Sequence, residues 1–127
     1  TRIGSRAPAH ATSAGKIMMA YQSEDFVEAF CRDLSQMQPL TAWTITSPAQ
    51  LREALVRARA DGYAMDKEEI EPGLICVGAP VFGMGQQVLA AVSIAGPAFR
   101  MQKELESMIQ EVKQTAANIS RLLGGRV

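Results

Sequence analysis

Apolar side chains recur at helical spacing in several stretches of the chain. The first stretch begins at Thr12 or Ser13, either of which suits an N-cap, and has apolar residues at positions 14, 17, 18 and 21. The second begins at Ser23, with apolar residues at positions 26, 27, 30 and 34. The last carries its stripe from position 105 to 123 and ends at Gly124 and Gly125. These patterns predict amphipathic helices near both ends of the chain.

A third helix, between these, has the clearest boundaries. Ser47 is an N-cap residue, Pro48 fits the first helical position, and Gln50 stands in capping-box register. Apolar residues at positions 51, 54, 55 and 58 predict its buried face. Gly62 ends the helix, where a left-handed residue is wanted.

Two apolar runs, 75–82 and 88–94, predict strands. The segment between them, Gly83-Met84-Gly85-Gln86, predicts a hairpin in which glycines supply the positive φ angles. Both strands are apolar on both faces, which predicts a sheet covered on each side. The element order predicts an α+β fold. Because two strands alone make a poor sheet, further strands are expected from an upstream segment or a partner chain.

Composition narrows the class of protein. The 127 residues are 47% apolar, with thirteen basic and thirteen acidic residues, as expected of one globular domain without a nucleic-acid-binding face. Two cysteines, 45 positions apart, and a single histidine make a zinc site unexpected and suit reduced thiols in the cytoplasm. No apolar run reaches the ~18–20 residues that cross a bilayer, so no membrane contact is expected. The chain starts at Thr1 without a methionine, which suggests a fragment.

The sequence offers little for catalysis. Lys16 lacks the glycine and the Ser or Thr of a phosphate-binding loop, and no nucleophile elbow is present. The acidic group at positions 66, 68, 69 and 71 lacks the spacing of a calcium loop and is expected to be solvated, with one member turned inward. No enzyme, metal or cofactor is therefore predicted.

Polar residues on connected elements instead favour a binding pocket. Asp66, Cys76 and Ser93 fall on the strands or beside them, and the helix start at Ser13-Ala14 offers free N–H groups to an anion. Each residue also has a plainer interpretation. Cys76 fits a core strand, a backbone carbonyl can satisfy Ser93, Asp66 can lie at the surface, and the helix start can simply pack on a neighbour.

A family resemblance is spread over the whole chain. It is carried by segment 4–16, the helix end Gly62-Tyr63-Ala64, Asp66-Lys67-Glu68-Glu69, segment 73–81, and Ser93-Ile94-Ala95-Gly96-Pro97. Together these segments resemble the effector-binding domain of IclR-family bacterial transcriptional regulators. The resemblance implies a GAF-like or profilin-like fold, a curved antiparallel sheet flanked by helices. It also implies that residues 1–127 form an effector domain incomplete at its N-terminal side, without the winged helix-turn-helix that binds DNA.

The resemblance further implies an effector site for a small organic acid, an oxoacid or an aromatic carboxylate. The backbone amides of Ser13 and Ala14 would grip its carboxylate. The remaining residues implied are Asp66 at the polar end, Cys76 and Ser93 as hydrogen-bonding partners, and Leu74 and Met18 as the apolar wall. Where several relatives have a second serine, this chain has Ala95.

These observations predict a small-molecule-sensing and oligomerisation domain of a DNA-binding regulator. The implied homo-oligomer, a dimer or tetramer, would use the last helix and the region of Trp43. DNA would be contacted only through the absent N-terminal domain. Two alternatives stay open: a purely structural oligomerisation domain, and an enzyme that uses Cys76 as its nucleophile.

Overall fold

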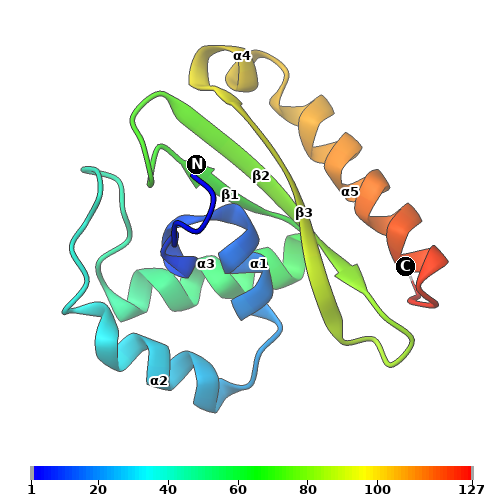
Figure 1. The fold of residues 1–127 in the computed structure, drawn as a ribbon, viewed down its shortest axis with the longest axis horizontal. Coiled ribbons are helices and arrows are strands. Elements are labelled where there is room, and N and C mark those ends of the chain that lie inside the picture. Colours follow the sequence, from blue (N-terminus) through cyan, green and yellow to red (C-terminus); the bar gives the residue numbers. More distant parts are fainter. Residues whose placement is uncertain (1, 127) are drawn as a thin grey trace.

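A three-stranded antiparallel sheet with helices on both faces forms the domain (Figure 1). The computed structural model describes residues 2–126. The elements in chain order are η1 (Ala9–Ala11), α1 (Ser13–Ala20), α2 (Glu24–Leu34), α3 (Pro48–Asp61), β1 (Ala64–Lys67), β2 (Leu74–Phe82), β3 (Val88–Pro97), α4 (Ala98–Lys103) and α5 (Leu105–Leu122). The predicted α+β class is confirmed.

The sheet has the order β1-β2-β3, with β2 in the centre. The register places Asp66 of β1 opposite Cys76 of β2, and Gly78 of β2 opposite Ser93 of β3. Strand β1 is one more than the sequence predicted. Its four residues are too few for a period of two to stand out, because they follow a helix stop and lead into an acidic turn.

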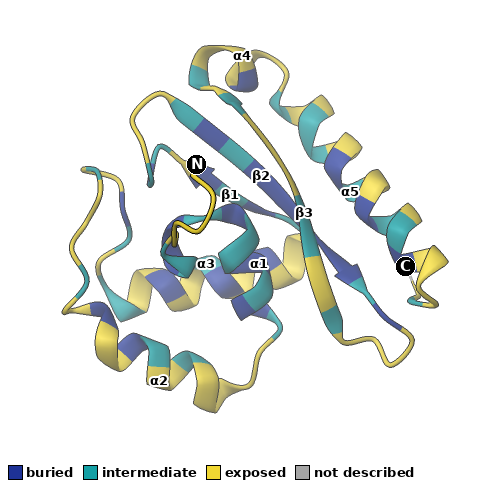
Figure 2. Cartoon of the chain, viewed as in Figure 1, coloured by how far each residue is buried: buried dark blue, intermediate teal, exposed yellow. Residues whose placement is uncertain are grey.

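Two apolar cores lie on opposite faces of the sheet (Figure 2). Helices α1 and α3 cover one face, with α2 packed outside α3, while α4 and α5 cover the other. The first core comprises Ile17, Met19, Ala20, Cys31, Leu34, Leu51, Leu55, Ala58 and Ala64. The second comprises Ile75, Val77, Ala79, Val81, Met101, Val112 and Ala116. Because β2 contributes to the packing of both layers, it is buried along most of its length.

Strand β3 departs from the prediction that both strands are covered on each face. It forms one edge of the described sheet, and Leu89 and Ile94 are 49% and 37% exposed. Only some of its residues reach the two cores, among them Ala91 on one face and Val92 on the other. An apolar sequence alone therefore did not distinguish a central strand from an edge strand.

The predicted helix starts are confirmed by their caps. Thr12, rather than Ser13, caps α1: its Oγ1 accepts a hydrogen bond from Gly15 N at 3.0 Å. Ser47 caps α3 in the same way, and Gly62 ends it with φ of 77°. Two stripe residues were predicted wrongly, because Phe26 at the start of α2 and Leu123 at the end of α5 are 47% and 46% exposed.

The hairpin between β2 and β3 forms where predicted, but not with the predicted backbone. The positive φ belongs to Gln86, at 61°, and not to either glycine of the turn. A Cβ on Gly83 would lie 2.7 Å from Leu89 Cδ1, the end of a half-exposed side chain that is able to turn away. The prediction of glycines with positive φ was therefore wrong, although the turn itself was right.

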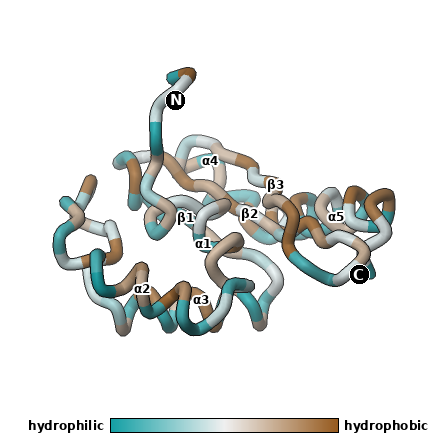
Figure 3. Tube along the Cα trace, turned by 60° about the horizontal axis from the view of Figure 1, so that its bottom comes forward, coloured by the Kyte–Doolittle hydropathy of each residue, from teal (hydrophilic) through white to brown (hydrophobic). Residues whose placement is uncertain are grey.

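Hydrophobic and hydrophilic residues alternate along helix α5 (Figure 3). In the same view, the first described residues of the chain extend away from the body of the domain.

Near the end of α5, Ser120 is fully buried, and its Oγ accepts a hydrogen bond from Phe82 N at 2.9 Å. This bond fastens α5 to the strand where the register shifts. Within residues 2–126, no helix is both long and apolar enough to span a bilayer.

Candidate functional site

The start of α1 presents backbone donors next to the sheet. The side-chain oxygen of Thr12 accepts a hydrogen bond from Gly15 N, and the carbonyl oxygen of Thr12 accepts one from Lys16 N at 3.0 Å. The N–H groups of Ser13 and Ala14 have no acceptor among residues 2–126. Two donors at the positive end of a helix dipole form a suitable seat for one carboxylate.

Ser13 lies directly over β2. It is 2% exposed, and a Cβ placed on Gly78 would come within 3.1 Å of Ser13 Oγ. The absence of a side chain at position 78 therefore lets the helix start approach the backbone of the strand. Ser93 stands opposite Gly78 on β3, so the register brings both serines to the same part of one sheet face.

Asp66 lies on β1, opposite Cys76 of the central strand. It is 1% exposed, which excludes the surface position that was one expectation. Its Oδ1 accepts a hydrogen bond from Glu69 N at 2.7 Å. Burial raises the pKa of the Asp66 carboxyl, and this hydrogen bond partly counteracts the rise. Of the acidic group, both Asp66 and Glu69 point inward rather than one member alone.

Cys76 faces Asp66 across the strand pair and is half-buried. Burial, and then the neighbouring Asp66 charge, raise the pKa of its thiol to about 11. At neutral pH the thiol is therefore protonated, which suits a hydrogen-bonding role and disfavours a nucleophile. His10, the one histidine, is buried and tilted against Phe30, and burial lowers its pKa.

The remaining predicted site residues lie around this face with different exposure. Leu74 is half-buried on β2, two positions before Cys76, and therefore shares its face. Met18 is half-buried on α1, and Ala14 is half-buried at its start. Ser93 is exposed, and its hydroxyl makes no hydrogen bond within the described residues. The sheet register, with the approach of Ser13 to Gly78, thus brings Ser13, Asp66, Cys76 and Ser93 to one face of the sheet.

Sequence reasoning missed the most strongly bonded polar pair beside this site. Lys16 and Glu69 form an ion pair at 2.6 Å, with side chains 6% and 8% exposed. Neither residue carried a signal in the sequence, since a lysine and a glutamate 53 positions apart have no local pattern. Among residues 2–126, no cluster of three or more His, Cys, Asp or Glu side chains is able to hold a metal ion.

Comparison with known proteins identifies the family of this fold and site. The family model described as bacterial transcriptional regulator IclR C-terminal matches residues 1–121. The chain belongs to the IclR family. An IclR-family relative, the HTH-type transcriptional regulator BhcR of Paracoccus denitrificans (strain Pd 1222), is 36% identical over 118 residues, which are 92% of this chain and 42% of the relative.

Solved IclR-type domains have the same architecture. The crystal structure of transcriptional regulator YaiJ aligns with a TM-score of 0.89 at 35% identity, over 98% of this chain and 70% of that one. The inducer-binding domain of PobR from Acinetobacter, a double mutant in complex with 3-hydroxybenzoic acid, aligns with a TM-score of 0.85 at 27% identity, over 95% and 70%. This chain therefore shares the α+β fold of these solved domains.

The IclR chain described here spans less than half the length of the curated relatives BhcR and XynR of Escherichia coli (strain K12), 42% and 49% respectively. These relatives are transcriptional regulators, which points to a regulatory, ligand-sensing domain rather than an enzyme.

Proposed function

We propose that this domain senses a small organic acid, an oxoacid or an aromatic carboxylate, and modulates transcription through a DNA-binding segment outside the chain. The observation that carries the proposal is the pair of unoccupied N–H donors of Ser13 and Ala14, placed over Gly78 beside the buried Asp66. The 3-hydroxybenzoic acid bound by the PobR domain supports an acid of this kind.

Each proposed contact follows from the position of a residue on this face. The α1 donors bind the carboxylate, Cys76 and Ser93 hydrogen-bond the ligand, and Asp66 faces its polar end. Leu74 and Met18 provide the apolar wall. Since Ala95 offers no hydroxyl, the ligand finds one fewer donor beside Ser93. A signal to DNA requires that the acid bind one conformation of the regulator more tightly than another.

The first experiment is a thermal-shift screen against glyoxylate, pyruvate, benzoate and 3-hydroxybenzoate. A ligand that binds the native state at 100 times its Kd adds about 2.7 kcal/mol, so the melting temperature is expected to rise by several degrees with at least one acid. Ser93→Ala is expected to reduce this shift, while Ser107→Ala, exposed on α5, keeps it.

A result in which no acid shifts the wild-type protein contradicts the proposal. It favours the alternative of a structural domain whose site binds nothing, for which the exposure of Ser93 and the open edge of β3 provide some support.

We further propose that a second copy of the chain packs against the loop between α2 and α3. Leu40 and Trp43 of this loop are 51% and 57% exposed. The loop borders a cleft of about 520 Å³ lined by Ala42, Trp43, Thr44, Ile45, Thr46, Gln50, Glu53, Ala54 and Arg57. The lining of this cleft is more polar than apolar, and the exposed tryptophan at its edge is the feature typical of an association surface.

Trp43→Ser is expected to shift the sedimentation profile toward monomer at micromolar concentration. Phe99→Ser is the control, because Phe99 is 66% exposed but lies on α4. An unchanged profile for Trp43→Ser would exclude this loop from the interface.

A further inference from the structure

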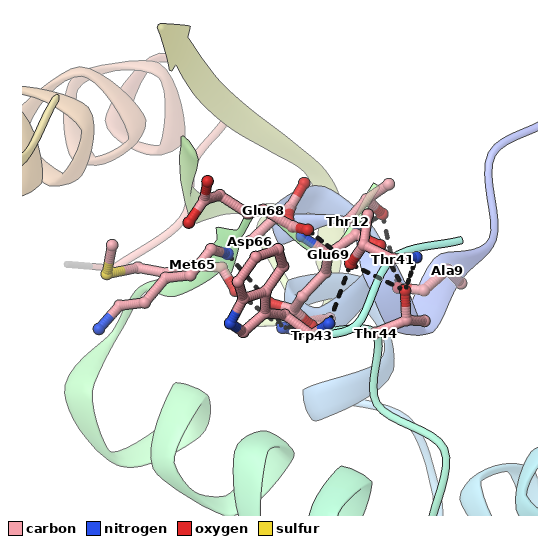
Figure 4. Close-up of polar contacts among 12 residues, drawn as sticks. Ala9, Thr12, Thr41, Trp43, Thr44, Met65, Asp66, Glu68 and Glu69 are labelled. Carbon is pink, nitrogen blue, oxygen red and sulfur yellow. Dashed lines mark hydrogen bonds and ion pairs between the residues drawn. The ribbon is translucent and has the colours of Figure 1, made fainter. Parts of the chain in front are cut away.

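The Lys16–Glu69 ion pair holds the backbone on both sides of Asp66. Lys16 Nζ donates to Glu69 Oε1 and Oε2 at 2.6 and 2.7 Å, and to the carbonyl oxygen of Met65 at 2.8 Å. Glu69 Oε2 in turn accepts from Lys67 N at 3.0 Å. The pair therefore bonds the residue before Asp66 and the residue after it. Figure 4 shows Met65, Asp66 and Glu69 among the polar contacts of this region.

These bonds matter because β1 has a strand partner on only one side within residues 2–126. An edge strand of four residues is easily displaced unless its free backbone groups find partners. Lys16 supplies a donor to Met65 O, and Glu69 supplies an acceptor to Lys67 N. The ion pair thus takes the place of a neighbouring strand along the stretch that carries Asp66.

The same pair joins Asp66 to the start of α1. Lys16 stands three positions after Ser13, so both residues point to the sheet from one face of the helix. Ser13 packs on Gly78, and Lys16 reaches the edge of β1. Glu69 closes the connection, because its own N–H donates to Asp66 Oδ1. The two parts of the proposed acid site, the helix start and Asp66, are therefore connected through these side chains.

Net stability is a weak explanation for this pair. Desolvation of two buried charges largely cancels their attraction, and well-packed apolar pairs of similar volume often replace such ion pairs without loss. The directional bonds to Met65 O and Lys67 N are what an apolar pair cannot reproduce. A role in geometry is therefore the better account.

We infer that Lys16 and Glu69 are positioning residues for the acid site, which fix Asp66 relative to the donors of Ser13 and Ala14. The inference rests on the proposed acid-sensing function. Neither residue needs to touch the ligand. Lys16 Nζ makes two contacts with the Glu69 carboxylate and one hydrogen bond to the carbonyl oxygen of Met65, so its charge is already compensated.

The test compares two uncharged double variants with the wild-type protein. Lys16→Met with Glu69→Leu removes both clamping bonds and leaves no unpaired charge. Lys16→Met with Glu69→Gln removes the donor to Met65 O but keeps an acceptor for Lys67 N. The ligand is the acid that gives the largest thermal shift among glyoxylate, pyruvate, benzoate and 3-hydroxybenzoate. Titration calorimetry with this acid is expected to show about tenfold weaker binding for the first variant. The second variant, which keeps one of the two bonds, is expected to recover part of that loss.

Arg52→Met with Glu28→Leu is the matched control. It removes another ion pair of 2.6 Å, which joins α3 to α2 and makes no contact with Asp66. Its affinity is expected to equal that of the wild type. Equal affinity of the Lys16→Met, Glu69→Leu variant and the wild type, at similar melting temperature, would overturn the inference.

Hydrogen exchange separates this inference from the proposed function. The Lys67 amide is expected to exchange faster in the Lys16→Met, Glu69→Leu variant, while the Val77 amide in the central strand keeps its protection. If no acid binds the wild-type protein, the proposed function fails, and faster exchange at Lys67 still supports the clamp itself. Unchanged exchange at Lys67 counts against the clamp whether or not an acid binds.

Discussion

Gly15→Ala is expected to destabilise the domain by about 3 kcal/mol, the upper range for overpacking a close contact. A Cβ at this position would lie 2.2 Å from the carbonyl oxygen of Ala9, and 2.5 Å from Ala9 Cα. Both are backbone atoms of η1, so no side-chain rotation relieves the clash. In an ordinary helix the same substitution would stabilise by about 1 kcal/mol, and the sign of the effect is therefore diagnostic. The melting temperature should fall by roughly 10 °C.

Gly85→Ala is the matched control for this substitution. Gly85 lies in the exposed hairpin turn, and the nearest atom to its added Cβ is Oε1 of the flexible Gln87 side chain at 2.9 Å. Its free energy of unfolding should change by less than about 0.5 kcal/mol. If Gly15→Ala and Gly85→Ala were equally stable, the backbone of Ala9 in η1 would not lie as close to Gly15 of α1 as the structure shows.

Lys16→Met alone is expected to cost about 3–5 kcal/mol, because it leaves the buried Glu69 carboxylate without its cation. The carbonyl oxygen of Met65 loses its donor at the same time. Urea denaturation, with the slope compared to that of the wild type, measures the loss.

Two comparisons test the reason for that loss. Adding Glu69→Leu to Lys16→Met should restore most of the stability, since the uncompensated charge is then gone. Arg57→Met removes an exposed ion pair with Glu53, at 2.9 Å and with side chains about 70% exposed, and should cost less than about 1 kcal/mol. A loss below 1 kcal/mol for Lys16→Met would mean that Glu69 finds water or another donor.

The sequence predicted those parts of the fold that depend on neighbouring residues. The starts of α1, α2 and α3 were placed correctly because N-cap residues act on amides three positions away. The end of α3 was placed correctly because Gly62 tolerates the left-handed backbone that stops a helix. Strand β1 was missed because four residues, two of them charged, do not show a strand period.

The sequence indicated which residues belong to the candidate site, but not how they lie relative to one another. Register, which needs the sheet, set Asp66 opposite Cys76 and Gly78 opposite Ser93. One inward member of the acidic group was expected, but the burial of a second was not, because an acidic turn is usually solvated. The Glu69 charge is compensated by Lys16 on α1, a contact that leaves no local signal in the sequence.

By itself the sequence determined the class of fold, the main helices, the hairpin and the polar residue types available for an acid site. Those properties follow from short-range backbone preferences and from hydrophobic period. The tertiary structure alone decided which strand lies at the edge, which residue of the turn takes a positive φ, and which charges are buried together. These depend on contacts between residues far apart in the chain, such as Lys16 and Glu69, for which local sequence carries no signal.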